Sequence, residues 1–529
     1  MTLDKQKLSN QLFKIKDLNI ILQESHDPAK QLKKALGPLD LILLGIGAII
    51  GAGIFTVIGT AAAGDLVRPG AGPSIILSFG LTAIACGFAA LCYSEFAAMV
   101  PISGSAYTYS YATFGELIAW IIGWDLMLEY TVANIAVAIS WSGYFTEFLR
   151  GFGIQLPPWA SIDFRSAFQG FEKASMLLSQ GMTFEQLNPG LQKAWFAVHN
   201  APHLFGMPLI LNIPAFLIVA MITTLLVIGI KESARFTSVM VAIKLLVLTF
   251  FVAVGLFYVK PENWSPFAPN GFAGIKTGAA IVFFAYIGFD AVSTVAEETK
   301  NPKRDLPIGI LGSLAICTVI YIIVSAVFTG LVPFSILKDT LASQKAEALS
   351  FAMKHINLHW ATGIVAAGAV VAQTAVLLVM QLGQSRIFFS MSRDGLLPPV
   401  FSKVHPKFKT PYITTIATGL FVALTASFSN IDEMVDLTNI GTLFAFVLVC
   451  FGVVILRVKE PHRHRTFKVP LNPVIPLLGV STCIFLMTGL PTITWIRFVV
   501  WLLIGFVVYF FYSMKHSLLR KTQSLPHKT

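Results

Sequence analysis

The sequence predicts an all-α integral membrane protein of about twelve transmembrane helices. Its 529 residues are 55% hydrophobic and only 12% charged, whereas soluble domains carry about 25% charged residues. Apolar stretches recur along almost the whole chain, and many of them reach the length of about 20 residues that a helix needs to cross the hydrocarbon core. Only helices and closed barrels satisfy the backbone in lipid, and the length of these stretches favours helices.

Twelve apolar stretches qualify as spans. They are predicted at Leu39–Ala63, Gly72–Met99, Gly115–Leu149, Pro208–Gly229, Ser233–Tyr258, Phe272–Ala296, Pro307–Leu331, Trp360–Met391, Pro411–Phe428, Val435–Leu456, Val474–Leu490 and Ile493–Ser513. The chain is therefore divided into an N-terminal arm (1–38), a transmembrane domain (39–513) and a C-terminal tail (514–529). Between spans 3 and 4, an insert at 150–207 is expected to form a capping loop with one or two surface helices, or else a ligand-binding lid.

The basic residues indicate the orientation of the chain. Seven lysines lie in the N-terminal arm: Lys5, Lys7, Lys14, Lys16, Lys30, Lys33 and Lys34. More lysines and arginines follow spans 4, 6, 8 and 10, as in Arg457–Lys468 after span 10. Cytoplasmic loops carry such an excess, so we predict a multi-pass protein of the cell membrane with both termini in the cytoplasm and the insert outside it. The net charge of +11 then reflects topology rather than nucleic-acid binding.

Several kinds of chemistry lack a basis in the sequence. All five cysteines (Cys86, Cys92, Cys317, Cys450 and Cys483) fall inside predicted spans, so neither a disulfide framework nor a metal-ligand spacing is indicated. No phosphate-binding loop, nucleophile elbow or HExxH pattern occurs. We therefore expect no metal, no cofactor and no enzymatic activity.

Two predicted spans are interrupted near their middle. Span 1 contains four glycines between Gly45 and Gly53, and glycine weakens a helix interior by about 1 kcal/mol each. Span 6 places Gly288 and Asp290 near mid-membrane. Small residues also serve close helix packing, but breaks at corresponding positions of two halves are typical of secondary transporters with inverted repeats and a mid-membrane substrate site.

An unwound helix exposes free N–H groups at one half-helix start and free C=O groups at the other half-helix end. These groups suit the carboxylate and the ammonium of an amino acid, and the ring of Phe284 could cover the site. The predicted substrate-binding residues at the breaks are Ile49, Gly51, Ala52, Gly53, Phe284, Ala285 and Ile287.

Lys244 lies about halfway along span 5, too deep for its ammonium to reach water easily. Intramembrane charges normally face the protein interior and mark functional sites. Because burial disfavours the charged form of an amine, we predict that Lys244 couples transport to protons. The alternative is a structural lysine that replaces a bound cation and pins two helices together.

Three carboxylates within the predicted spans are further candidates. Asp125 and Glu129 lie four residues apart on one face of span 3. Glu129 is predicted to contact a cationic substrate side chain, or alternatively to bond neighbouring helices. Asp290 follows the span 6 break, where either a second protonation site or a half-helix cap fits.

The order of several motifs resembles the amino acid-polyamine-organocation superfamily. These motifs are Leu44–Phe55, Glu95–Pro101, Gly104–Tyr107, Gly123–Asp125, Ile243–Lys244 and the stretch from Phe289-Asp290 to Pro307. Two further motifs, Arg386–Pro398 and Asn439–Leu443, are most similar to its cationic amino acid transporter family. The resemblance implies the five-plus-five inverted-repeat fold, with spans 1–5 and 6–10 as repeats and spans 11 and 12 peripheral.

The resemblance also implies roles for single residues. Substrate backbone binding is carried over to Ile49, Ala52, Gly53, Phe284 and Ile287, and proton coupling to Lys244. Several relatives have Ser or Thr where this chain has Ala52, so the substrate carboxylate would rest on backbone amides alone.

We therefore predict a permease for L-amino acids that works by alternating access, is coupled to protons and contacts the lipid bilayer. Glu129 slightly favours arginine, lysine or ornithine over small neutral amino acids such as alanine. The alternatives are a membrane amino acid sensor and an amino acid/polyamine exchanger. The sequence does not indicate symport or antiport, or an oligomeric state.

Overall fold

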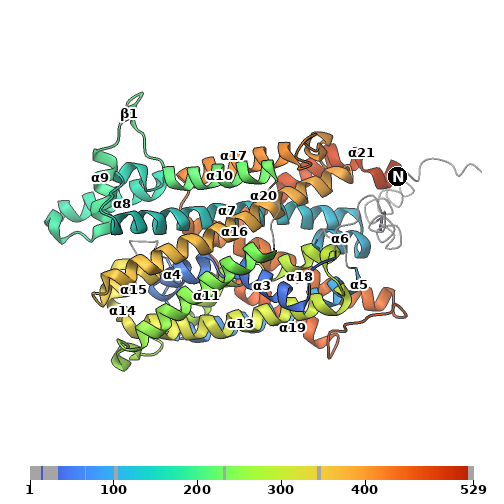
Figure 1. Cartoon of the computed structure of the whole chain (residues 1–529), viewed down its shortest axis with the longest axis horizontal. Coiled ribbons are helices and arrows are strands. Elements are labelled where there is room, and N and C mark those ends of the chain that lie inside the picture. Colours follow the sequence, from blue (N-terminus) through green and yellow to red (C-terminus); the bar gives the residue numbers. More distant parts are fainter. Residues whose placement is uncertain are drawn as a thin grey trace, which may run out of the picture.

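The computed structural model describes residues 14–15, 34–65, 67–100, 105–229, 234–341 and 347–521. Outside these ranges lie most of the predicted N-terminal arm and residues 522–529 of the predicted tail. Residues 101–104, which include parts of two motifs that carry the family resemblance, also lie outside them. Figure 1 shows a bundle of long helices running side by side. The one sheet in the described ranges is the small antiparallel pair β1 (His203–Leu204) and β2 (Met207–Pro208).

In the part of the chain that the structure describes, twelve apolar segments form the bundle, in the order of the predicted spans. They are α3 (Pro38–Ile49) with α4 (Ile58–Ala63), α5 (Ile75–Met99), α7 (Glu116–Gly151), α10 (Ile213–Ile228), α11 (Ala234–Leu256), α12 (Gly271–Val282) with its continuation, α13 (Pro302–Leu331), α16 (His359–Arg393), α17 (Tyr412–Phe428), α18 (Ile431–Lys459), α19 (Val474–Met487) and α20 (Thr492–Val508). Among the described residues, eight helices are long and apolar enough to span a membrane, one bent pair adds a ninth, and α10, α17 and α19 are shorter apolar helices.

The remaining elements are short or lie outside the bundle. They are η1 (Gly53–Val57), η2 (Gly72–Ser74), α6 (Ser105–Thr113), η3 (Pro158–Ala160), α8 (Phe164–Ser179), η4 (Phe184–Gln186), α9 (Pro189–His199), η5 (Pro261–Trp264), η6 (Phe283–Tyr286), η7 (Asp290–Glu298), α14 (Phe334–Ile336), η8 (Leu337–Leu341), α15 (Ala348–His355), η9 (Pro399–Ser402), η10 (Tyr509–Ser513), α21 (Met514–His516) and α22 (Leu518–Lys521).

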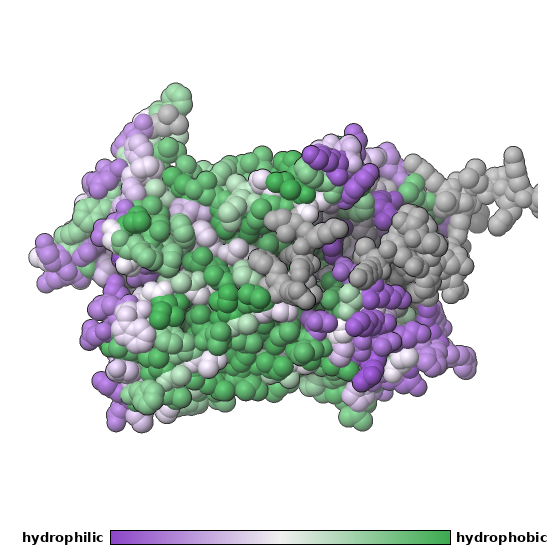
Figure 2. Space-filling model, in the orientation of Figure 1, coloured by the Kyte–Doolittle hydropathy of each residue, from purple (hydrophilic) through white to green (hydrophobic). Residues whose placement is uncertain are grey.

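The surface has the pattern of a membrane protein. Figure 2 shows, on the face in view, a broad hydrophobic belt around the middle of the molecule and hydrophilic residues gathered at its two ends. A belt of this kind matches the hydrocarbon core of a bilayer flanked by its polar interfaces. Together with the helix lengths, it confirms the predicted all-α integral membrane fold.

Span 4 begins later than the sequence predicted. Pro208, the predicted first residue, belongs to strand β2. The helix α10 begins at Ile213 because the side chain of Asn212 caps it, accepting a 3.2 Å hydrogen bond from the backbone N–H of Ala215. Hydropathy alone cannot distinguish a short apolar hairpin from the first turn of a span.

Both predicted helix breaks are present. In span 1, α3 ends at Ile49, Ile50 is extended (φ −75°, ψ 104°), and η1 continues as a π-helix from Gly53, with the two halves bent by 44°. In span 6, η6 ends before Gly288, which has φ +119°, a conformation that glycine adopts without strain. The helix then resumes at Asp290.

Helix packing relates two sets of five spans. α7 packs on α16, α5 on α13 and α10 on α17, so each pair joins a span with the span five places later. The packing of α3 on α13 has its counterpart in α12 on α5, and the packing of α18 on α7 has its counterpart in α11 on α16. This exchange of equivalent contacts is the expected result of the five-plus-five repeat.

The insert forms a helical cap over one end of the bundle, here called the insert end (left in Figure 1). Its helices α8 and α9 pack on each other. Arg165 pairs with Glu433 of α18 at 2.8 Å, and Asn430 donates a 2.9 Å hydrogen bond to the hydroxyl of Ser166. These contacts hold the cap to the start of span 10. The opposite end, where α21 lies in Figure 1, is here called the termini end.

Candidate substrate-binding site

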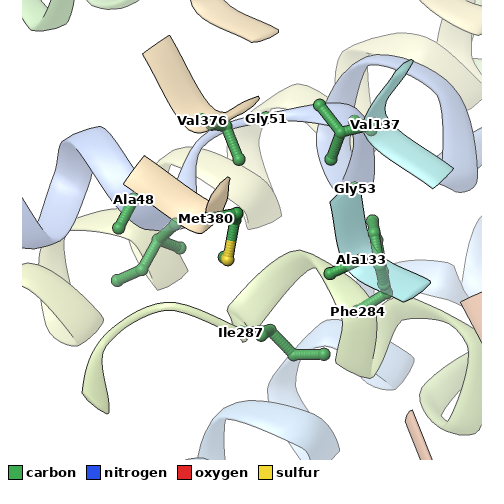
Figure 3. A pocket seen from close by; sticks show the side chains of 11 residues that line it. Ala48, Gly51, Gly53, Ala133, Val137, Phe284, Ile287, Val376 and Met380 are labelled. Atoms are coloured by element: carbon green, nitrogen blue, oxygen red, sulfur yellow. The ribbon is translucent and has the colours of Figure 1, made fainter. Parts of the chain in front are cut away.

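A small cavity lies between the two helix breaks. Its lining residues are Ala48, Ile49, Gly51, Ala52, Gly53, Ala133, Val137, Phe284, Ile287, Val376 and Met380, and Figure 3 shows how they surround it. Its free volume is about 10 Å³, close to the room that one water molecule needs. Of the eight predicted substrate-binding residues, all but Ala285 and Glu129 line this cavity.

Span 1 contributes a helix start to the cavity wall. Ala52 precedes the first residue of η1, Gly53, and both are buried. The first N–H groups of a helix have no acceptor within it, and the positive end of the helix dipole favours an anion at this position. The backbone of Ala52 and Gly53 can therefore receive a carboxylate.

Ala285 holds the two breaks together instead of lining the cavity. A Cβ atom added at Gly53 would lie only 2.3 Å from the Cα of Ala285, so the two backbones touch. This contact requires glycine at position 53. The sequence predicts a direct role of Ala285 in substrate binding, and the structure places this residue at the span 6 break but outside the cavity lining.

Tyr321 of span 7 is a functional candidate that the sequence analysis missed. Its hydroxyl lies 3.0 Å from the carbonyl oxygen of Ile49 and 2.8 Å from that of Ala285. The tyrosine is fully buried and so connects the carbonyl groups of both breaks. A tyrosine hydroxyl near the middle of span 7 was the available signal, because buried tyrosine hydroxyls usually find hydrogen-bond partners.

We expect Tyr321→Phe to weaken the site without removing the fold. The substitution keeps the ring but leaves two buried carbonyl groups without this donor, at a cost of about 1–3 kcal/mol. Substrate uptake measured as kcat/KM is expected to fall roughly tenfold, with normal amounts of folded protein. An unchanged kcat/KM would remove Tyr321 from the site.

Two further spans supply the apolar wall. Ala133 and Val137 of α7 lie four residues apart, as do Val376 and Met380 of α16, so each pair shares one helical face. Figure 3 shows the Met380 side chain pointing into the middle of the cavity. The sequence did not single out these four residues, because every apolar span contains pairs at this spacing.

Glu129 lies outside the cavity but on the face of α7 that lines it. It precedes Ala133 by four residues, which places it about 6 Å nearer the termini end, and only 3% of it is exposed. Asp125 lies one further turn away and is fully buried; neither carboxylate oxygen of Asp125 has a hydrogen-bond partner among the described residues. A substrate in the cavity would contact Glu129 only through a long side chain or after the helices move.

Lys244 touches the broken helix of span 1 directly. Its ammonium donates hydrogen bonds of 2.7 Å to the carbonyl of Gly47 and 3.0 Å to that of Ile50, and the side chain is fully buried. No carboxylate lies within 4.0 Å of it in the described part of the chain. The negative end of the α3 dipole therefore stabilises the charge, and a change in that charge would act on the end of α3 beside the substrate site.

Asp290 starts the helix that follows the span 6 break and is 1% exposed. Its Oδ2 atom has no hydrogen-bond partner among the described residues, while Ser293 donates a 2.7 Å bond to its backbone carbonyl. The position fits both interpretations derived from the sequence, a protonation site and a half-helix cap.

Hydrogen bonds separate the cavity from the insert end. Tyr144 donates a short bond to the carbonyl of Phe55, and the hydroxyls of Thr56 and Ser140 are 2.6 Å apart. α7 runs from the termini end toward the insert, so Ser140 and Tyr144 follow the cavity-lining Val137 in that direction. These contacts form a barrier between spans 1 and 3, here called the insert-side barrier.

Comparison with known proteins agrees with this arrangement. Residues 36–524 match the family described as Amino acid permease. The chain is 49% identical to the branched-chain amino acid permease BcaP of Bacillus subtilis (strain 168), covering 93% of this chain and 96% of that protein. It is 43% identical to the methylthioribose transporter of the same organism, over 96% of this chain and 99% of the relative.

A cationic relative is also similar. The vacuolar cationic amino acid transporter 4 of Arabidopsis thaliana is 35% identical, covering 85% of this chain and 68% of that protein. All three relatives are named as transporters or permeases rather than enzymes. The family match over most of the chain, the broken spans and the cavity between them lead to one conclusion: the chain belongs to the amino acid permease family.

Proposed function

We propose that this permease carries neutral amino acids with branched apolar side chains across the cell membrane by proton-coupled alternating access. The observation that supports the proposal best is the cavity between the two broken helices, whose lining side chains are all apolar. The amino acid backbone would bind the breaks, and its side chain would face the apolar wall. The name of the BcaP relative supports the same substrate class.

The two ends of the substrate backbone have separate partners. The amides of Ala52 and Gly53 would bind the carboxylate. Tyr321 already contacts the carbonyls of Ile49 and Ala285. We therefore assign the ammonium to the backbone carbonyl of Ile287. This residue is extended and follows the η6 turn, so its carbonyl lies outside regular helical hydrogen bonding.

The side-chain wall favours a neutral substrate. Val137, Val376 and Met380 offer contact to a branched aliphatic group, and burying such a group contributes about 1.5–3 kcal/mol. A cationic side chain would need a counter-charge, since burying an unpaired charge costs far more, and Glu129 lies beyond the cavity. Neutral branched substrates are therefore favoured over the cationic ones that Glu129 suggested from the sequence.

The size of the cavity supports alternating access. A space of about 10 Å³ is far too small for an amino acid, so α7 and α16 must move away from the two breaks before substrate enters. Lys244 bonds the end of the broken α3, so its protonation would bias this movement. A ligand shifts such an equilibrium only through different interactions with the two states.

The orientation proposal rests on the distribution of basic residues. The N-terminal arm, the C-terminal tail and the loops after even-numbered spans carry most of the lysines and arginines, and cytoplasmic loops are the basic ones. We therefore assign the termini end to the cytoplasm and the insert end to the outside, in the cell membrane.

Uptake into proteoliposomes tests this function. Uptake of radiolabelled leucine, isoleucine, valine, alanine, arginine and lysine would be measured with and without an imposed pH gradient. Methylthioribose would be added as a competitor, because one relative is named as a methylthioribose transporter. We expect accumulation of the branched-chain substrates that increases with an inside-alkaline gradient. Accumulation of arginine and lysine alone would refute the proposed substrate class, and equal uptake with and without the gradient would refute proton coupling.

We expect Glu129→Gln to leave the discrimination between leucine and arginine unchanged. The carboxylate lies outside the cavity lining, so the relative inhibition of leucine uptake by the two amino acids should shift by less than about threefold. A selective loss of arginine inhibition would restore Glu129 as the residue that recognises a cationic side chain.

A further inference from the structure

A second, much larger cavity lies under the insert, on the far side of the insert-side barrier. Its volume is about 610 Å³, within the range of about 300–1,000 Å³ typical of ligand pockets. The insert forms its roof, and the outer part of α7 and the start of α15 form its walls. This cavity is here called the outer chamber.

The outer chamber lies close to the substrate site along span 3. Val137 lines the inner cavity, whereas Ile139, Gly143 and Thr146 line the outer chamber. The six residue steps from Val137 to Gly143 rise by about 9 Å along a helix. Ser140, whose hydroxyl lies 2.6 Å from that of Thr56, falls within this interval, and Tyr144, which donates to the Phe55 carbonyl, directly follows it. A molecule in the chamber would therefore lie on the other side of the insert-side barrier from the substrate site.

Two opposite charges face the chamber without pairing. Lys193 of α9 and Glu347 at the start of α15 both line it and are half-buried. Each lies within electrostatic range of the other, but no ion pair within 4.0 Å joins them in the described ranges. The Lys193 ammonium donates one 3.1 Å bond to the Ser161 carbonyl, which leaves further N–H groups for a ligand.

Both charges are poorly solvated. Burial lowers the pKa of Lys193, although the nearby Glu347 raises it, and burial raises the pKa of Glu347, although Lys193 lowers it. Three other charged groups near them already have partners. Glu147 and Arg150 form an ion pair at 2.6 Å, and the Asp163 carboxylate caps α8 by accepting a hydrogen bond from the backbone N–H of Ser166. A ligand that brought one negative and one positive group would complete the solvation of Lys193 and Glu347.

We propose that the outer chamber is a second amino acid site, in which Lys193 binds the carboxylate and Glu347 the ammonium of a zwitterionic substrate before it passes the insert-side barrier. The proposal rests on the proposed function and narrows its substrate class. Among the residues that the structure describes, four lysine or arginine and three aspartate or glutamate side chains line the chamber. It therefore has no excess of negative charge to attract an amino acid with a cationic side chain, and it favours a net-neutral one.

The test uses the sidedness of the chamber. Leucine uptake would be measured in oriented proteoliposomes with substrate on the insert face or on the termini face, for Lys193→Gln and Glu347→Gln. Charge-assisted hydrogen bonds of this kind correspond to roughly tenfold to hundredfold in affinity. We expect KM on the insert face to rise about tenfold, with kcat kept within about twofold and KM on the termini face unchanged.

Lys338→Gln and Glu172→Gln are matched controls, because both residues are exposed and lie outside the chamber lining. They should behave as wild type. An unchanged insert-face KM in both chamber variants, or an equal rise on both faces, would overturn the proposal.

A second measurement needs no variant. Purified wild-type protein should bind more than one leucine per chain at saturation, and a stoichiometry of one would also overturn the second site. If the wild type takes up no amino acid from either face, the proposed function fails, and the zwitterionic ligand of the chamber fails with it. If the wild type transports leucine normally and only the chamber results are negative, the inference fails alone.

Discussion

Lys244→Ala is expected to abolish proton-driven accumulation of leucine while exchange between equal internal and external pools continues. The wild-type ammonium donates hydrogen bonds to the carbonyls of Gly47 and Ile50 at the end of the broken α3. Removing it eliminates the group whose protonation would shift the equilibrium between the transport states. One pH unit corresponds to about 1.4 kcal/mol per proton, or about tenfold accumulation for one proton per substrate. The variant should stay near a ratio of about one, measured with the membrane potential clamped.

A second substitution separates coupling from structure. Lys244→Arg keeps a positive charge that cannot be released in the accessible pH range. It should resemble Lys244→Ala if deprotonation matters, and it should resemble wild type if a fixed charge is all that span 5 supplies. Lys276→Ala is the control, since that lysine lies over the ring of Phe485 away from both breaks. Gradient-driven accumulation by both Lys244 variants would return Lys244 to the role of a structural pin.

Gly53→Ala is expected to eliminate substrate uptake. The new Cβ would lie 2.3 Å from the Cα and 2.5 Å from the Cβ of Ala285, and backbone atoms cannot yield without moving the two breaks apart. Overpacking of this kind typically costs about 1–3 kcal/mol, and the displacement would fall on the groups assigned to the carboxylate. We expect kcat/KM for leucine to fall by more than about a hundredfold.

Substitutions at two other glycines are controls for Gly53→Ala. A Cβ at Gly51 would meet only the Val376 side chain, at 2.9 Å from its Cγ2 atom, and a Cβ at Gly80 would meet nothing within 4 Å. Gly51→Ala should therefore raise KM only severalfold, because the valine can rotate, and Gly80→Ala should match wild type. Wild-type affinity in Gly53→Ala would show that the break of span 1 does not form the site.

The positions of the helix breaks were predictable because they depend on local backbone chemistry. The glycines before Gly53 and the Gly288-Phe-Asp290 step weaken a helix wherever they occur, and the structure breaks the two spans at these points. The two sets of five spans follow from the matching positions of the breaks. These features required no knowledge of which helices pack together.

The side-chain wall of the site was not predictable in the same way. Ala133, Val137, Val376 and Met380 look like any other apolar residues of a membrane span, and only the packing of α7 against α16 places them at the cavity. The sequence predicts Glu129 as a site residue because of its charge, yet helix geometry places it one turn outside the lining. In lipid, hydrophobicity does not distinguish residues that face the substrate from residues that face other helices.

The insert shows the same limit on a larger scale. Its amphipathic stretches indicated surface helices, and α8 and α9 are present. The sequence did not indicate that Lys193 and Glu347, more than 150 residues apart, would face one chamber. Such a pairing depends on how the cap seats on the bundle, which the Arg165–Glu433 pair helps to fix.

The most direct test of the substrate site is protection of a cysteine placed in the cavity wall. Met380→Cys would be introduced into a transport-competent background without the five native cysteines, with Leu382→Cys on the same helix but outside the lining as control. We predict that leucine, at concentrations several times its KM, slows alkylation of the cysteine at 380 severalfold, that arginine does not, and that neither changes the control. Undiminished alkylation at 380 in saturating leucine, with transport intact, would contradict a substrate site between the two breaks.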